Sequence, residues 1–429
     1  MEIAYLALCF VLLVSVVMLG IPIGFGMLTV AAVFLVLGDV KVSVLSMTLV
    51  GAFDSWTWLA IPLFVMMGYL MNACGITTRL IAFANAFVGH FRGGTALATV
   101  ATNFLMAGMS GSMLADLASS GVVFAPAMKK EGYPTRFTTT VLGVSAMLGP
   151  LIPPSIGFIV YGVMTGVSIG RLFVAGLIPA FLVTILLTVY IVVMARRHQL
   201  PVHPRVPLRN GMATAWYALP ALLLPVVVIG GMRSGYFTAV EGGGMAVVYV
   251  AIVGVLMRGF SRKGIDEAIV ETIKLSLALL FVIGTGVLFQ SVLSYLGFIQ
   301  PLLDAFQGFH GTTLFLLATV ALCLVMGLVV DTPVIIILFA PLLSSIAKKI
   351  GIDPVHYGVV FYFTSLIGTL TPPFATGMFV LMRITDVKLE EYLRGMLPMI
   401  VFLIGITLVL VFFPQLVVFL PNLVYGASG

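Results

Sequence analysis

Two carboxylates, Asp116 and Asp331, interrupt long apolar runs of the sequence. Ser110-Gly111-Ser112 precedes the first and Thr332-Pro333 follows the second. A carboxylate in apolar surroundings can bind a cation, whereas the free N–H groups of a helix that starts at such a break favour an anion. Two simpler roles stay open: Asp331 could cap the helix in which Pro333 is a first-turn residue, and Asp116 could lie at a solvated hairpin tip.

Two double prolines give a second kind of candidate site, at the ends of the segments Gly149–Pro154 and Gly368–Pro373. Proline has no N–H and its ring clashes with the preceding turn, so each pair should break a helix and release carbonyl oxygens. Within hydrocarbon those oxygens need protein, water or an ion, and carbonyl oxygens suit a hard cation such as sodium. A plain kink is the alternative for one such segment alone; the presence of two favours an ion site.

These features recur at a nearly fixed distance along the chain. Asp331 follows Asp116 by 215 positions, and after a four-residue insertion the separation is 219. The pairs at 219 include Lys129 and Lys348, Gly149 and Gly368, Pro153-Pro154 and Pro372-Pro373, and Pro179 and Pro398. A shared offset over so long a segment predicts an internal repeat.

The basic residues predict that the two copies have opposite orientation. The helix after Pro179 ends in Arg196-Arg197, a cytoplasmic signature, whereas its counterpart after Pro398 has no basic residue up to the chain end. Lys348 and Lys349 count against this assignment, but Asp353 lies close by and weakens their weight. Inverted repeats with Gly- and Pro-broken spans are typical of secondary transporters.

The composition places these sites in a membrane. Of the 429 residues, 61% are apolar and 8% are charged, against about a quarter charged in soluble proteins. This excludes a soluble, a secreted disulfide-rich or a disordered chain, and leaves room for roughly ten to twelve spans or half-spans. The net charge of +6 comes from basic residues in short loops, so it indicates topology and no nucleic-acid partner. Cys9, Cys74 and Cys323 are expected to be small core residues, and the histidines show no metal-binding spacing.

Three local patterns predict particular elements. Residues 76–93 mix apolar and basic residues as an interfacial amphipathic helix does. Thr238 and Glu241 have the spacing of a capping box at a helix start. The last apolar run, at about 397–420, is expected to be one C-terminal span.

Taken together, the chain resembles the large membrane subunit of a tripartite ATP-independent periplasmic (TRAP) transporter. The resemblance covers nearly the whole sequence. It departs from the family pattern at Ala239-Val240, where a Pro-Thr pair is usual, and at Gly242 to Gly244. The residues that carry it are Ser110-Gly111-Ser112 with Ala115-Asp116, Gly149-Pro150 with Ile152-Pro153-Pro154-Ser155, Arg233 to Thr238 with Glu241, Asp331-Thr332-Pro333, and Gly368 with Leu370-Thr371-Pro372-Pro373.

The resemblance implies an all-α polytopic membrane protein, an inverted-repeat, elevator-type secondary transporter with two re-entrant hairpins and two discontinuous helices. Its parts would be N-terminal scaffold helices (1–75), an interfacial arm helix (76–94), transport-domain repeat 1 (95–195), a cytoplasmic loop with scaffold helices (196–265), a second arm helix and scaffold (266–311), and transport-domain repeat 2 with a C-terminal span (312–429). The implied partners are a small four-span membrane subunit, a periplasmic substrate-binding protein and the lipid bilayer of a bacterial inner membrane.

The resemblance also assigns the site, residue by residue. One sodium ion is expected near Ser110, Gly149, Ile152 and Pro154, and a second near Gly327, Asp331, Gly368, Thr371 and Pro373. A small organic anion is expected between them, near Ser112, Asp116 and Ser155. Dicarboxylates, sugar acids and sialic acids all remain open as substrates.

Other classes of function use the same residues differently. A sodium symporter that works without a binding protein is the nearest alternative. An intramembrane aspartyl protease would also need two embedded carboxylates, although the double prolines would then have no purpose. A channel would conduct without saturating. The transporter assignment implies that the chain is not an enzyme.

Overall fold

The computed structural model describes residues 11–13, 15–16, 19–37, 43–297, 311–373 and 375–426, without the side chains of Val44 and Leu208, and this part consists of helices joined by loops, with no strand. Cys9 lies outside these residues, while Cys74 and Cys323 are buried free thiols, as predicted. The N-terminal half contains α2 (Ile23–Leu37), α3 (Ser43–Gly51), the 3₁₀ helix η1 (Trp56–Leu59), α4 (Ala60–Ala73), α5 (Ile76–Val88), α6 (Gly94–Ser110), α7 (Met113–Lys130), α8 (Thr135–Ala146), α9 (Leu148–Leu151), α10 (Ile156–Thr165), α11 (Ile169–Ala175) and α12 (Leu177–Arg197). The remainder contains α13 (Leu208–Arg233), α14 (Ala239–Leu256), α15 (Arg262–Tyr295), α17 (Thr312–Gly327), α18 (Thr332–Lys349), α19 (Pro354–Gly368), α20 (Thr376–Thr385), α21 (Leu389–Phe412) and α22 (Pro414–Tyr425).

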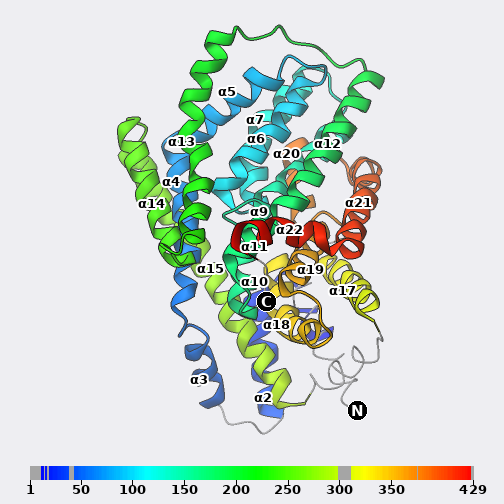
Figure 1. Cartoon of the computed structure of the whole chain (residues 1–429). Helices are drawn as coiled ribbons and strands as arrows, with labels where there is room; N and C mark the ends of the chain where they lie inside the picture. Colours follow the sequence, from blue (N-terminus) through cyan, green and yellow to red (C-terminus); the bar gives the residue numbers. More distant parts are fainter. Residues whose placement is uncertain are drawn as a thin grey trace.

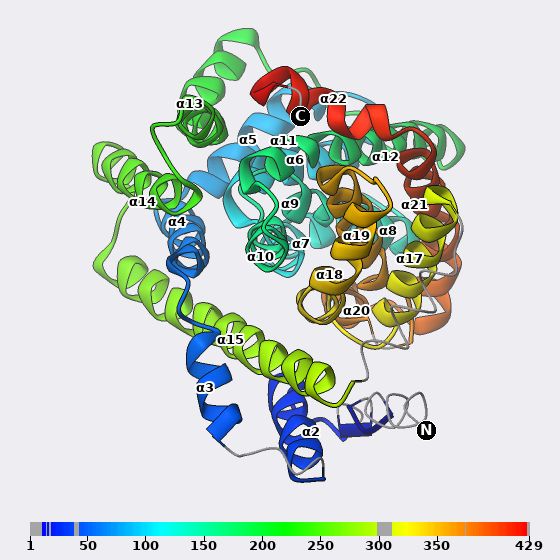
Figure 2. The same cartoon turned by 60° about the horizontal axis from the view of Figure 1, so that its bottom comes forward.

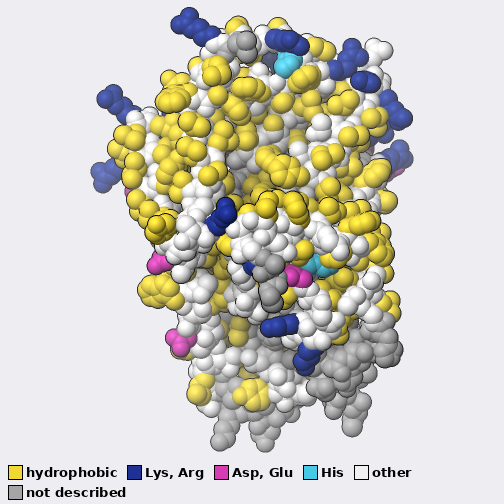
Figure 3. Space-filling model, viewed as in Figure 1, with side chains coloured by type: hydrophobic (Ala, Val, Ile, Leu, Met, Phe, Trp, Pro, Cys, Tyr) yellow, Lys and Arg dark blue, Asp and Glu magenta, His cyan; other side chains and the backbone are white. Residues whose placement is uncertain are grey.

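The helices present an apolar surface suited to lipid. Among the described residues, seven helices are long and apolar enough to cross a membrane, or up to eight if one bent pair is a single span. Lys and Arg side chains surround the upper end of the molecule, above a broad hydrophobic surface (Figure 3). The arginines of residues 196–209 belong to this end, because that segment joins α12 and α13 there (Figure 1). Basic residues gathered at one end of a hydrophobic surface are typical of a polytopic protein with its basic loops in the cytoplasm.

Each half of the chain contains a helical hairpin followed by an interrupted helix. In the first half, α6 and α7 meet at Gly111-Ser112, and α8–α9 bends by 45° from α10 across residues 152–155. In the second half, α17 and α18 meet at residues 328–331, and α19 and α20 are separated by residues 369–375. Both double prolines therefore lie at helix breaks, and both Pro-Pro peptide bonds are cis.

The two halves run in opposite directions. The end of α12 lies beside the start of α8, where the rings of Tyr190 and Phe137 stack with centroids 5.5 Å apart. The start of α21 lies at the same place, because a Cβ on Gly395 would come within 2.8 Å of the Thr140 hydroxyl oxygen. Thus α12 ends where its counterpart α21 begins. At the other end of α21, the Leu410 carbonyl oxygen lies 2.8 Å from the His356 ring at the start of α19.

The remaining long helices form a separate edge of the molecule. Figure 2 shows α2, α3, α4, α13, α14 and α15 along one side of the compact group made by the hairpins and interrupted helices. Helix α5 joins the two groups, since it packs on both α6 and α13. Its Arg79 guanidinium lies 5.6 Å from the centroid of the Tyr217 ring on α13, a cation–π contact.

Two local predictions can be compared with these helices. The capping box at the start of α14 is present, since Glu241 and Thr238 bond each other's backbone N–H groups. The predicted C-terminal span is present as α21, which is long and apolar enough to cross a membrane, but the bounds 397–420 are wrong: α21 stops at Phe412 and α22 starts at Pro414. Pro414 has no N–H to continue the α21 ladder. Arg171 on α11 then holds α22 in place by bonding the Asn422 side chain and, at 3.0 Å, the Gly426 carbonyl oxygen.

Glycine permits the closest approach between the second hairpin and the second interrupted helix. A Cβ on Gly327 would lie 2.6 Å from the Cα of Gly368, so the two backbones touch where α17 and α19 end. Backbone atoms cannot move aside as a flexible side chain can. The Gly327→Ala substitution should therefore destabilise the protein by about 1–3 kcal/mol, as overpacking typically does.

The measurement is the apparent Tm of the detergent-purified protein. Gly405→Ala is the matched control, because Gly405 lies within α21 and none of the described residues would come within 4 Å of a Cβ there. Alanine there should leave the Tm unchanged or raise it, since it has the better helix propensity. Equal Tm values for the two variants would contradict the close contact.

Candidate functional site

The tip of the first hairpin rests directly on the first helix break. Gly111 has a positive φ of 57°, and a Cβ there would lie 2.7 Å from the carbonyl oxygen of Pro154. Glycine meets both demands, the left-handed backbone and the close approach. The hairpin tip can therefore cover the carbonyl groups that the double proline leaves free.

Asp116 is sealed between the hairpin and the break. It lies in the first turn of α7 and is 0% exposed. Its carboxylate packs so closely on Gly149 that any Cβ on that glycine would overlap it. Among the described residues, no group donates a hydrogen bond to either oxygen of this carboxylate. The Ser110 hydroxyl lies close by, since a Cβ on Gly149 would come within 3.3 Å of it. A buried carboxylate without donors is costly, so this position calls for a proton or a cation.

The first break also leaves backbone oxygens without their usual partners. In an α-helix the carbonyls of Gly149 and Pro150 would accept from residues 153 and 154, but both of these are prolines. The Pro150 oxygen is satisfied instead by the Ser155 hydroxyl. The whole segment 149–155 is buried. Ser110, Gly149 and Pro154, three of the predicted sodium ligands, are therefore brought together, and Ile152 lies in the same buried segment.

The second hairpin and break form a similar but more open arrangement. Asp331 occupies the N-cap position of α18, the simpler role left open for it, but within the described part of the chain its side chain makes no cap bond. Its carboxylate accepts a 2.6 Å hydrogen bond from the Thr376 hydroxyl at the start of α20. The Thr332 hydroxyl donates to the Ser365 carbonyl oxygen at 3.1 Å, which ties the tip to α19.

Only some of the other residues predicted for this second site contact one another. Gly327 and Gly368 touch through their backbones. The Thr371 hydroxyl, in the break, donates to the Ile367 carbonyl oxygen near the end of α19 at 2.8 Å. Pro373 is exposed and Asp331 half-buried, in contrast to the sealed first site.

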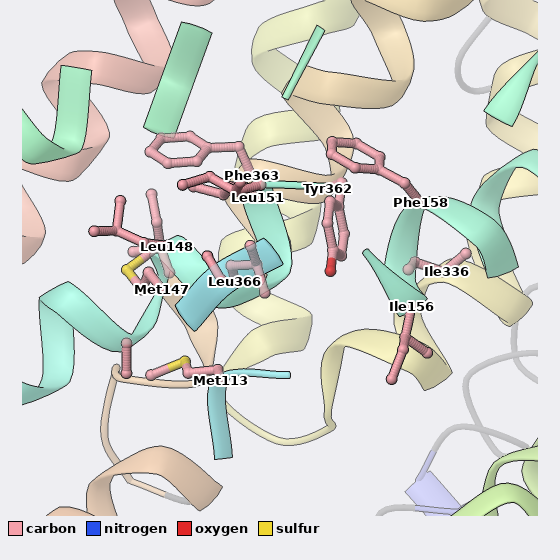
Figure 4. Packing of buried hydrophobic residues seen from close by; sticks show 14 of the residues in the cluster. Met113, Met147, Leu148, Leu151, Ile156, Phe158, Ile336, Tyr362, Phe363 and Leu366 are labelled. Atoms are coloured by element: carbon pink, nitrogen blue, oxygen red, sulfur yellow. The ribbon is translucent and has the colours of Figure 1, made fainter. Parts of the chain in front are cut away.

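A cavity of about 230 Å³ lies between the two hairpin tips and the two breaks. Figure 4 shows part of its apolar surroundings, where Met113 and Leu366 lie below Tyr362 and the Phe158 ring packs beside it. Leu275 and Leu279 of α15 complete the lining. Its polar side chains are Ser112, Asp331, Thr332, Tyr362, Thr369 and Thr376.

The three residues predicted to bind substrate differ in their position. Ser112 lines both the cavity and a small crevice beside α4, whereas Asp116 belongs to that crevice alone. Ser155 lies behind the lining and caps α10, accepting from the Phe158 N–H at 3.3 Å. The sequence analysis missed Tyr362 and Thr376. Thr376 could have been found as the polar residue that opens the helix after the second double proline.

The family of the chain follows from comparison with known proteins. The family model described as "Tripartite ATP-independent periplasmic transporter, DctM component" matches residues 9–416. The chain belongs to this DctM family. It is 33% identical over 410 residues to the sialic acid TRAP transporter large permease protein SiaM of Vibrio cholerae, covering 95% of this chain and 96% of that protein. It is 36% identical over 371 residues to the C4-dicarboxylate TRAP transporter large permease protein DctM of Pseudomonas aeruginosa, covering 86% and 87%.

A solved structure shows the same fold. The YdaH transporter of Alcanivorax borkumensis matches with a TM-score of 0.61 and 16% identity over 86% of this chain and 87% of that one. The chain is thus a multi-pass inner-membrane protein of a transporter family, not an enzyme. The positions of the two aspartates agree with this, because a protease dyad needs two carboxylates at one site, whereas Asp116 and Asp331 face different cavities.

The contact between Asp116 and Gly149 can be tested in this TRAP permease by a double-mutant cycle. Gly149→Ala should lower the apparent Tm, because its methyl group would overlap a buried carboxylate. In the Asp116→Ala background the same change should cost much less, giving a coupling energy of about 0.5–3 kcal/mol. Additive effects of the two substitutions would contradict the contact.

Proposed function

We propose that this DctM-family permease takes up a small organic anion together with sodium ions across the inner membrane. In this proposal the two hairpins are re-entrant, and an elevator movement of the hairpins and interrupted helices carries the substrate. A periplasmic binding protein delivers the substrate, and a small four-span subunit completes the membrane complex. The observation that carries the proposal is the convergence of two hairpin tips and two helix breaks around one cavity.

The first break has the donor set that sodium requires. Hard cations are bound by carboxylate, carbonyl and hydroxyl oxygens. In this proposal Asp116, which the sequence assigned to the substrate, supplies the carboxylate, and the Ser110 hydroxyl and Pro154 carbonyl supply the other two kinds, packed against Gly149 and Gly111. Residues held this closely could bind an ion without a protein rearrangement, and the ion would offset the cost of the buried carboxylate.

The second site would use Asp331 in the same way. Its carboxylate lies at the cavity and is held by Thr376 from beyond the second break. The Gly327–Gly368 contact brings the end of α17 to the carbonyl groups before the double proline. Because this site is half-buried, an ion could enter it from the cavity side.

An anion suits the cavity between these sites. Helices α7 and α18 both begin at its edge, and helix N-termini favour negative charge. The hydroxyl groups of Ser112, Thr332 and Thr376 could orient the polar end of the substrate. The relatives named for sialic acid, C4-dicarboxylates and 2,3-diketo-L-gulonate support a carboxylate-bearing substrate.

Glycine contacts support movement of the hairpins against the long helices. Gly68 on α4 faces the backbone of Met109 near the first tip, and Gly286 on α15 faces the Ile337 side chain of α18. Such surfaces without large side chains let two packed groups slide past each other. Helix α5, which contacts both groups, would be the arm between them.

The sodium assignment of Asp331 can be tested by uptake into proteoliposomes. Asp331→Asn should raise the sodium concentration for half-maximal uptake at least about tenfold, which corresponds to about 1.4 kcal/mol of lost binding energy. Asp266→Asn, an exposed change at the start of α15, is the control and should behave like the wild type. Wild-type uptake by Asp331→Asn at low sodium would refute the assignment.

The dependence on partners needs its own measurement. Proteoliposomes containing this chain, with and without its small subunit and binding protein, should take up labelled sialic acid, C4-dicarboxylate or sugar acid only when both partners are present. Saturable, sodium-driven uptake by the chain alone would instead establish the stand-alone symporter.

A further inference from the structure

We propose that the groove between α6 and α12 binds an anionic phospholipid of the inner leaflet, with the headgroup held by Arg92 and Arg196. This groove, of about 680 Å³, lies away from the hairpin tips. Its walls come from the end of α5, the loop that follows it, the first half of α6 and residues 184–196 of α12. The transport cycle proposed above does not use it.

Two arginines stand together at one end of the groove. Arg92 and Arg196 both line it, and their chain neighbours Gly93 and Ala195 touch, since a Cβ on Gly93 would lie 2.9 Å from that of Ala195. Both side chains are exposed, and among the described residues neither has an ion-pair partner. Glu131, the residue after α7, contacts α6 close to Arg92, but its carboxylate accepts a 2.7 Å hydrogen bond from the Thr95 hydroxyl and lies 3.2 Å from the His203 ring. Two unpaired cations side by side repel each other unless an anion lies between them.

The rest of the groove suits an acyl chain. Leu97, Val100 and Ala101 line it from α6. The hydroxyl groups of Thr184 and Thr188, on α12, donate to backbone carbonyls of their own helix at 2.8 Å, which satisfies their polar atoms. An apolar channel that ends at two guanidinium groups has the polarity of one phospholipid molecule.

The length of the groove matches one leaflet. From Arg196 to Thr184 is twelve residues of α12, or about 18 Å along the helix axis. Half of the hydrocarbon core of a bilayer is about 15 Å. Just beyond the far end, the rings of Phe104 on α6 and Phe181 on α12 pack with centroids 5.5 Å apart and close the gap between the helices.

The arginine end is on the cytoplasmic side. Arg196 and Arg197 begin the basic loop between α12 and α13, and cytoplasmic loops carry the excess of basic residues. Gln415 stands where the repeat would place a counterpart of Arg196, so the site belongs to one half of the protein and to one leaflet. Anionic headgroups attract juxtamembrane Lys and Arg with about 1 kcal/mol per residue.

The proposal can be tested by native mass spectrometry of the delipidated, detergent-purified full chain. The probes are phosphatidylglycerol and phosphatidylcholine with identical acyl chains. The wild type should bind phosphatidylglycerol more tightly. The double variant Arg92→Gln/Arg196→Gln should lose about thirty-fold in affinity for it, two residues at about 1 kcal/mol each, with no change for phosphatidylcholine. Arg197→Gln, which is exposed but does not line the groove, is the control and should lose far less.

A second pair of variants tests the groove without changing charge. Thr188→Phe would fill the groove, whereas Val189→Phe adds a similar ring to the 56%-exposed outer face of the same helix. Only the first should weaken phosphatidylglycerol binding. The proposal is overturned if the double arginine variant binds phosphatidylglycerol like the wild type, if the two phenylalanine variants behave alike, or if the complex with the small subunit excludes the lipid that the chain alone binds. These measurements involve neither sodium nor substrate, so they succeed or fail independently of the proposed transport.

Discussion

The arrangement of the site depends on four prolines that cannot donate a hydrogen bond. Each double proline removes two N–H groups from a helix, in a fully buried segment at the first break and a partly exposed one at the second, so the carbonyls one turn earlier lose their helical partners. The protein must supply replacements from its own tertiary structure. Ser155 serves the Pro150 oxygen, and the Gly377 N–H serves the Thr369 oxygen at 3.1 Å. The hairpin tips then cover what is left, which is why each tip lies at a break.

Small residues make this covering possible. Gly111 approaches the Pro154 carbonyl, Gly149 leaves space for the Asp116 carboxylate, and Gly327 meets Gly368. Close packing in a membrane protein gains little from the hydrophobic effect, because lipid is as apolar as the side chains, so contact between backbones carries more of the stability. The same glycines therefore shape the candidate ion sites and hold the hairpins in place.

The two halves have related sequences, but their aspartates are buried to different degrees. Asp116 is fully buried, while Asp331 is half-buried and bonded to Thr376. The repeat is thus symmetric in its helices and asymmetric in its side-chain contacts. The lipid-facing surface is asymmetric as well, since Arg92 and Arg196 mark only the first half.

The sequence alone determined the membrane class, the two breaks and the opposite orientation of the halves, because these follow from composition, from the chemistry of proline and from the positions of basic residues. It also located Asp331 at a helix start and the capping box of Thr238 and Glu241, which depend only on neighbouring residues. The tertiary structure decided which predicted ligands meet. Ser110, Gly149 and Pro154 come together, while Ser155 turns away from the cavity to cap α10. The tertiary structure also places Tyr362 and Thr376 in the lining of the cavity, and it ends α21 at Phe412. Contacts between segments that are not neighbours along the chain leave no periodic pattern in the sequence, so only the packing of helices fixes them.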